Sequence, residues 1–316
     1  LSAPPTEAYE NVDQAKAAAS TPATAMATAE PTVEVEDVAT FEETYYGQGY
    51  RREEACETPS EYWEAVRALL VLMYMSQKGL SEADAKPAAK EFRNRLEKDV
   101  SRVSADGVPD QMILQRLLSS AAWVAARCWT STERCTLMKK EWCGVLQAAL
   151  RLNAKDMSTY VINIFATMNL YSVSDRTDRD AINAIEWPVA SNEETLEEPW
   201  ILHRGGRLPE EYVDWYKKAI ANQTIYRVGM ALPTSKIGTK AIDFMLSQSY
   251  PKDVPMLYTR YHLSKMLRCK HVNCFEPATL VKKEQEFCFP PYSAFKATKL
   301  ELKTEGGLEF YQLDVD

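Results

Sequence analysis

Three short segments in the last third of the chain combine side chains that suit ligand binding and catalysis. In the first, Ile201–Arg207, an apolar run ends in Arg204 followed by two glycines. Arginine presents a planar fork of donors to phosphate oxygens. Glycine lets a ligand approach the backbone closely. Alone, this pattern also fits an ordinary strand that ends in a glycine turn.

The other two segments carry hydroxyl and carboxyl groups. Segment 226–236 runs from a predicted strand into Thr234 and Ser235, which alone would be interpreted as satisfying the backbone groups of a turn. Segment 282–295 contains Glu284 and Glu286. If that segment is extended, the two carboxylates point to the same side, about 7 Å apart. Such a pair can divide catalytic work, although a solvated charge run has the same composition.

In this order and spacing, the three segments together resemble the arginine-type mono-ADP-ribosyltransferases. The signature of that family is an arginine on the first strand, a Ser-Thr-Ser motif and a Glu-x-Glu loop. The segment from Glu284 through Phe287, with the Phe-Pro-Pro-Tyr-Ser-Ala-Phe run that follows, is the most specific match. The resemblance covers roughly the last third of the chain and does not extend to the residues before it.

The resemblance implies a site for NAD, which would be a substrate. Arg204 would hold the phosphate or the nicotinamide-ribose side of NAD, and Gly205 would receive the carboxamide. His203, Thr234 and Ser235 would complete the binding site. No metal is needed for this chemistry.

The resemblance also implies how the glycosidic bond of NAD would be cleaved. Glu286 would stabilise the oxocarbenium-like state of the ribose as nicotinamide leaves, as carboxylates do in glycoside cleavage. Glu284 would orient the acceptor, an arginine guanidinium in the best-known subset. Two residues depart from the family pattern: Pro233 replaces the first serine of the motif, and His203 replaces the usual tyrosine.

Three functions are compatible with these residues. We favour an NAD-dependent protein mono-ADP-ribosyltransferase, a glycosyltransferase that modifies an acceptor protein. The alternative is a catalytically impaired domain of the same fold that serves as a structural or accessory subunit of a larger assembly, such as an organellar complex. A sensor that binds NAD or ADP-ribose without turnover is a third option.

The predicted fold class is α+β, with three parts that position these residues. Residues 1–57 are rich in Ala, Thr, Pro and Glu and are expected to form a flexible acidic arm, able to contact partner subunits. Residues 58–157 are expected to form a helical bundle, and residues 158–316 a mixed β-sandwich with helices, like that of the ADP-ribosyltransferases. Helices are predicted near 60–78, 81–103, 110–129 and 130–153, then 209–221 and 239–247. Strands are predicted at 200–204, 224–232, 254–261, 287–289 and 295–302.

Composition excludes some classes of function. A net charge of −8 disfavours a general nucleic-acid binder, and no apolar run approaches the length of a membrane span. Seven cysteines, an odd number without a tight framework, favour a reducing intracellular compartment, either the cytoplasm or an organelle reached after processing. Cys269, His271 and Cys274 could in principle bind zinc, but they lack the paired spacing of a zinc site.

Overall fold

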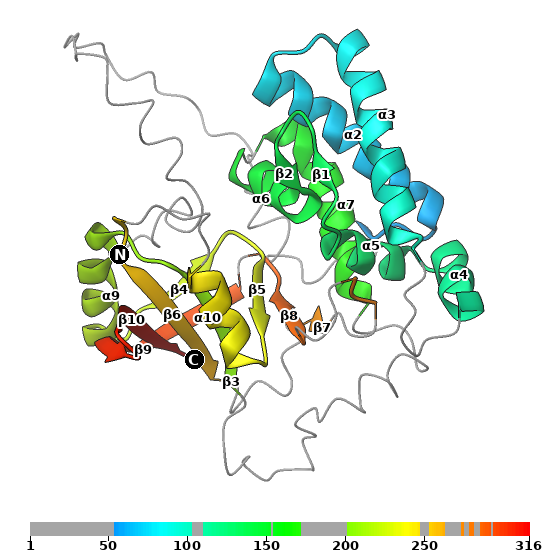
Figure 1. The fold of residues 1–316 in the computed structure, drawn as a ribbon. Coiled ribbons are helices and arrows are strands. Elements are labelled where there is room, and N and C mark those ends of the chain that lie inside the picture. Colours follow the sequence, from blue (N-terminus) through cyan, green and yellow to red (C-terminus); the bar gives the residue numbers. More distant parts are fainter. Residues whose placement is uncertain are drawn as a thin grey trace, which may run out of the picture.

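A computed structural model of the chain describes residues 54–102, 110–152, 154–171, 201–246, 253–262, 273–274, 278–280, 285–291 and 293–316 (Figure 1). Residues 1–53 of the expected arm, Glu284, which was predicted to orient the acceptor, and the possible metal ligands Cys269 and His271 lie outside these residues. Helices α2 to α7 come before residue 172, and the strands of the large sheet, with helices α9 and α10, come after residue 200.

The first two helices begin where the sequence predicts, and the second ends at Val100, three residues before its predicted end. Helix α2 spans Pro59–Lys78, with the Thr58 hydroxyl accepting from the backbone N–H of Glu61 at 3.2 Å. It ends at Gly79, whose φ of 63° is the left-handed conformation that favours glycine. Helix α3 spans Glu82–Val100 and is capped by Ser81. Local side-chain caps set these boundaries, which is why they can be predicted from the sequence.

The predicted helix over 110–129 is two helices. Helix α4 spans Asp110–Ser119, and helix α5 spans Ala121–Trp129. Ser120 lies between them in an extended conformation, and its hydroxyl accepts from the backbone N–H of Trp123 at 3.2 Å. A serine that caps a new helix competes with continuation of the previous one, so the single-helix prediction is wrong here.

The predicted helix over 130–153 is also wrong in its first half. Residues Arg134–Cys135 (β1) and Lys140–Glu141 (β2) form a small antiparallel hairpin, and helix α6 covers only Trp142–Leu152. A further helix, α7, spans Lys155–Leu170, where the sequence analysis had not placed one, and it packs against α2 and α5.

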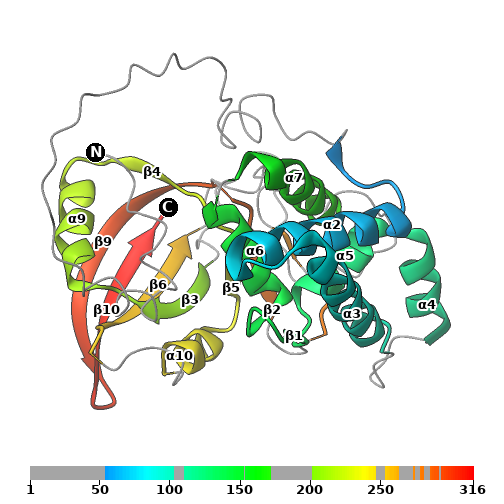
Figure 2. The same cartoon turned by 90° about the horizontal axis from the view of Figure 1, so that it is seen from above.

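The second half is built on a curled, mixed sheet in the strand order β4-β9-β10-β6-β3-β5-β8-β7. Only β10 and β6 run parallel, and the other neighbouring pairs are antiparallel. The long β9 curves along one side of the sheet (Figure 2). The strands are Ile201–Arg207 (β3), Ile225–Val228 (β4), Leu232–Ser235 (β5), Met256–His262 (β6), Asn273–Cys274 (β7), Glu286–Phe289 (β8), Ser293–Glu305 (β9) and Leu308–Val315 (β10). The α+β class is therefore confirmed.

Helices α9 (Glu210–Ala221) and α10 (Gly238–Leu246) match the two helices predicted within this half. The predicted strand over 224–232, in contrast, is two strands far apart in the sheet. Strand β4 pairs with β9 at one edge, whereas β5 lies between β3 and β8. Strand β10 was not predicted. Among the described residues, none of the helices has the length and apolar character required to cross a membrane.

Two hydrophobic cores meet at β8. Phe287 and Phe289 belong to the core of the sheet, whereas Cys288 belongs to the core of the helical region. This alternation follows from the two-residue period of a strand. Strand β8 therefore has one face toward the sheet core and one face toward the helices.

Candidate functional site

The three segments singled out from the sequence lie on three neighbouring strands, β3, β5 and β8. In their register, His203 pairs with Ser235, and Ser235 pairs with Glu286. Directly paired residues project from the same face of a sheet. The fold therefore brings a histidine, a hydroxyl and a carboxylate, up to 83 residues apart in sequence, into one row.

Glu286 is half-buried, and its carboxylate has a partner from the helical region. Its Oε1 accepts a hydrogen bond from Nε1 of Trp129 at 2.9 Å. Trp129 is the last residue of α5 and is buried. A hydrogen-bond donor to a carboxylate favours the ionised form. Trp129 is not predicted from the sequence, because a tryptophan at the end of an apolar helix carries no sign of this contact.

Arg204 lies next to His203 and alternates to the other side of β3. Its Nη1 donates to the carbonyl oxygen of Pro233 at 2.8 Å. The register of β3 and β5 contains only the pair His203 and Ser235, so the backbone ladder does not continue to Pro233. The Arg204 side chain thus connects the two strands where the ladder stops.

The thiol of Cys288 responds to both site charges. Burial raises the pKa of this thiol well above its usual value, the Glu286 carboxylate raises it further, and the Arg204 guanidinium lowers it. Both charges therefore lie within electrostatic range of one buried sulfur.

The two hydroxyl residues differ in orientation. Thr234 is buried and donates through Oγ1 to the carbonyl oxygen of Phe287 at 2.8 Å, so its hydroxyl secures β5 to β8. Ser235 lies in the row with Glu286, and its Oγ accepts from the backbone N–H of Ile237 at 2.9 Å. Ser235 is therefore the hydroxyl residue that shares a face with the carboxylate.

His203 stacks on Tyr258, with ring centroids 5.7 Å apart, and its Nδ1 is 2.8 Å from the Tyr258 hydroxyl oxygen. Burial lowers the pKa of His203, and the nearby charges of Arg260 and His262 lower it further. The imidazole is consequently held in its neutral form over a wider pH range than a free histidine. Such a ring offers a flat face and one hydrogen-bonding nitrogen.

Gly205 has a packing role that the sequence did not show. A Cβ atom built on Gly205 would lie 1.7 Å from the carbonyl oxygen of Ala241 in α10. Only glycine allows this helix to approach β3 so closely. Gly206, in contrast, has no heavy atom within 4 Å of such a Cβ.

The backbone between the two glutamates is not extended. Gln285 has a φ of 45°, in the left-handed region that non-glycine residues seldom occupy. Glu284 lies outside the described residues, so the expected spacing of the two carboxylates remains a prediction. Within the described ranges, no group of His, Cys, Asp and Glu side chains is arranged to hold a metal ion.

No protein-family profile matches the sequence, and no curated protein matches it. Solved structures with a similar arrangement include the ADP-ribosyltransferase HopU1 of Pseudomonas syringae pv. Tomato DC3000, which is 13% identical over 72% of this chain and 97% of its own, with a TM-score of 0.42. The type III effector XopAI of Xanthomonas axonopodis pv. citri is 12% identical over 87% and 89%, with a TM-score of 0.43. Vis toxin, an ADP-ribosyltransferase of Vibrio splendidus, is 13% identical over 75% and 87%, with a TM-score of 0.35. At these identities and TM-scores the likeness concerns the arrangement of elements, and the chemistry of this chain depends on its own site residues.

Proposed function

We propose that the chain is an NAD-dependent protein mono-ADP-ribosyltransferase. One observation carries this proposal: the row of His203, Ser235 and Glu286 on adjacent strands, with Arg204 next to His203 in β3 and hydrogen-bonded to Pro233 of β5. An anionic dinucleotide needs a cation and close backbone approach, and a developing ribosyl cation needs a fixed carboxylate. Both kinds of group are present in this part of the sheet.

The reaction would break the bond between C1′ of the ribose and the nicotinamide nitrogen. The electron pair of that bond leaves with nicotinamide, which becomes neutral, and the ribose takes an oxocarbenium-like form. The ionised carboxylate of Glu286 stabilises that positive charge. An acceptor nitrogen, such as that of an arginine guanidinium, then forms a bond to C1′ and loses a proton. Glu284 is our candidate to orient this acceptor and take the proton.

The alternative is an accessory subunit that has lost catalysis, and Pro233 motivates it. Pro233 pairs with Cys288, whereas Glu286 pairs with Ser235. Opposed side chains in antiparallel strands lie about 5 Å apart at Cβ. Although Pro233 has no hydroxyl, the hydroxyl residue opposite Glu286 is Ser235, which is retained. This supports the enzyme over the accessory subunit.

The test is to incubate the purified full chain with NAD labelled in the nicotinamide and adenine parts. We expect release of nicotinamide and, with an acceptor protein or an arginine analogue present, transfer of ADP-ribose. Glu286→Gln should reduce the release by about a hundredfold or more, because it removes the charge that faces the transition state. Glu305→Gln, an exposed change in β9, is the matched control and should retain activity.

Calorimetric titration of the same proteins with NAD distinguishes the other two functions, the sensor and the accessory subunit. Binding without nicotinamide release would identify a sensor. Neither binding nor release, with identical behaviour of wild type and Glu286→Gln, would refute the enzyme and favour the accessory subunit.

A further inference from the structure

We infer that Trp129 is a positioning residue for Glu286, so that the helical region before the sheet forms part of the active site. This inference rests on the proposed function for its catalytic consequence. The contact itself, from Nε1 of Trp129 to Oε1 of Glu286 at 2.9 Å, joins two elements 157 residues apart in the chain. An indole N–H can only donate and a carboxylate can only accept, so the direction of this bond is fixed.

The indole ring has little freedom to move away from Glu286. Trp129 is 3% exposed, and its ring packs edge-on against Phe165 of α7, with centroids 6.2 Å apart. The residue after it, Thr130, accepts through Oγ1 from the backbone N–H of Leu280 at 2.9 Å. Because Leu280 lies shortly before β8 in the chain, the end of α5 is attached to the segment that leads into Glu286.

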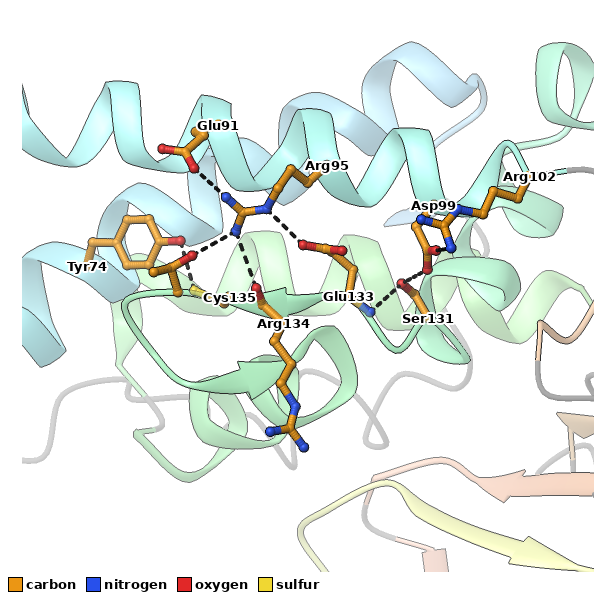
Figure 3. Close-up of polar contacts among 10 residues, drawn as sticks. Tyr74, Glu91, Arg95, Asp99, Arg102, Ser131, Glu133, Arg134 and Cys135 are labelled. Carbon is orange, nitrogen blue, oxygen red and sulfur yellow. Dashed lines mark hydrogen bonds and ion pairs between the residues drawn. The ribbon is translucent and has the colours of Figure 1, made fainter.

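The loop that follows Trp129 is fixed from its other side by α3. Arg95 donates through Nε to the carboxylate of Glu133 at 2.8 Å, and through Nη2 to Thr136 Oγ1 at 3.0 Å and to the Arg134 carbonyl at 3.3 Å (Figure 3). Its Nη1 also donates to Glu91. One guanidinium thus ties helix α3 to several points of the loop.

A second contact of α3 fixes the start of the same loop. Ser131 Oγ donates to Asp99 at 2.5 Å and accepts from the backbone N–H of Glu133 at 3.1 Å (Figure 3). Both Ser131 and Asp99 are buried. Since the loop is held on both sides of Ser131, the end of α5 is also held, and the Trp129 indole is presented to Glu286 by a rigid support.

Further contacts join the helical region to the site segments. The Gln147 side chain of α6 pairs with both backbone groups of Ala231, which lies directly before β5. Tyr171 accepts through its hydroxyl oxygen from the backbone N–H of Ala278 at 3.2 Å, and Arg127 donates to the Ala278 carbonyl at 3.4 Å. The helices therefore contact the chain before β5 and the chain before β8. Trp129 is the residue among these that reaches the proposed catalytic carboxylate.

The bond has two consequences for Glu286. It fixes the carboxylate in one orientation, and it favours the ionised form that the proposed reaction needs. The Cys288 thiol, two residues after Glu286 in β8, is influenced by the Glu286 carboxylate, by the Arg204 guanidinium of β3 and by Cys143 of α6. Replacing Trp129 with Phe keeps most of the apolar ring and removes the donor.

The first test does not depend on activity. In the full chain labelled with nitrogen-15 in tryptophan, the indole signal of Trp129 is assigned by its loss in Trp129→Phe. We expect this signal to move as pH falls and Glu286 becomes protonated, and to lose that movement in Glu286→Gln. The other tryptophan indoles report whether the fold persists. An indole signal of Trp129 that is unaffected by Glu286→Gln would overturn the inference.

The second test measures nicotinamide release against pH. Trp129→Phe should lower kcat by about tenfold to a hundredfold, change KM for NAD by no more than about twofold, and move the acid limb of the profile to higher pH. The matched control is Trp123→Phe in the same helix, because the buried Trp123 Nε1 has no hydrogen-bond partner. Equal profiles for the two variants would overturn the inference. If the wild type released no nicotinamide, the proposed function would be refuted. The pH titration of the Trp129 indole signal would still test the hydrogen bond between Trp129 and Glu286.

Discussion

Arg204 donates a hydrogen bond to the carbonyl oxygen of Pro233 at 2.8 Å, across the two strands that carry the first two motifs. Proline has no backbone N–H to continue a ladder, but its carbonyl remains an acceptor. The position at which the sequence departs from the Ser-Thr-Ser pattern therefore holds the site arginine through its backbone. A serine is not required for this contact.

Arg204→Lys should weaken NAD binding by about tenfold or more, because a lysine cannot reproduce the planar fork of donors. Calorimetric titration with NAD measures the change. Arg227→Lys on the edge strand β4 is the control, since Arg227 is exposed and away from the row. Equal affinities for the two variants would contradict a role of Arg204 in binding.

Gly205→Ala should destabilise the fold by about 3 kcal/mol, because the added methyl group would meet the Ala241 carbonyl and push α10 away from β3. Gly206→Ala is the matched variant one residue later, with open space at its Cβ, and should be neutral or stabilise by about 0.5–1 kcal/mol. Urea unfolding followed by circular dichroism compares the two. A reversed order of stabilities would show that α10 does not pack there as described.

Gln147→Ala should lower the free energy of unfolding by about 3 kcal/mol, because both backbone groups of Ala231 lose their partner in a buried place. Gln115→Ala, in the exposed part of α4, should change it by less than about 0.5 kcal/mol. Urea unfolding monitored by tryptophan fluorescence gives both values. Equal effects would argue against this contact between the helical region and β5.

His203 should make stability depend on pH in the mildly acidic range. Its pKa in the folded chain is lowered by burial and by Arg260 and His262, while in the unfolded chain it is about 6.5. The unfolded state then binds more protons than the folded state below that pH, so stability falls as pH falls through about 6.5. His203→Gln should reduce this slope in unfolding experiments between pH 5 and pH 7.5. An unchanged slope would exclude His203 as its source.

Gln285→Gly should stabilise the fold by about 1 kcal/mol, because glycine adopts the φ of 45° without steric cost. Gln223, which follows α9, has a φ of 51°. Gln223→Gly is therefore a matched variant with the same expected gain in stability. The two should differ in activity: Gln285→Gly loosens the segment before Glu286 and should lower nicotinamide release, whereas Gln223→Gly should not. Thermal unfolding and release assays test both parts. Equal release from the two variants would refute a functional role for the backbone at Gln285.

The sequence by itself determined the features that depend on neighbouring residues. Thr58 and Gly79 fixed the ends of α2, and the apolar patterns located the strands β3, β4, β6, β8 and β9 and the helices α9 and α10. It also provided Arg204 and Glu286 as candidate site residues, because their residue types and order carry a chemical meaning. Local caps and side-chain periodicity act over a few residues, so they can be recognised without the fold.

Only the tertiary structure decided which distant residues meet. Ser120 stopped a helix that the periodicity would have continued, and residues 224–232 were divided between two distant positions of the sheet. Strand pairing placed Glu286 beside Ser235, and the packing of α5 brought Trp129 to the same carboxylate. These two contacts join residues 51 and 157 positions apart in the chain. They depend on strand register and on packing, and the sequence around each residue does not identify its partner.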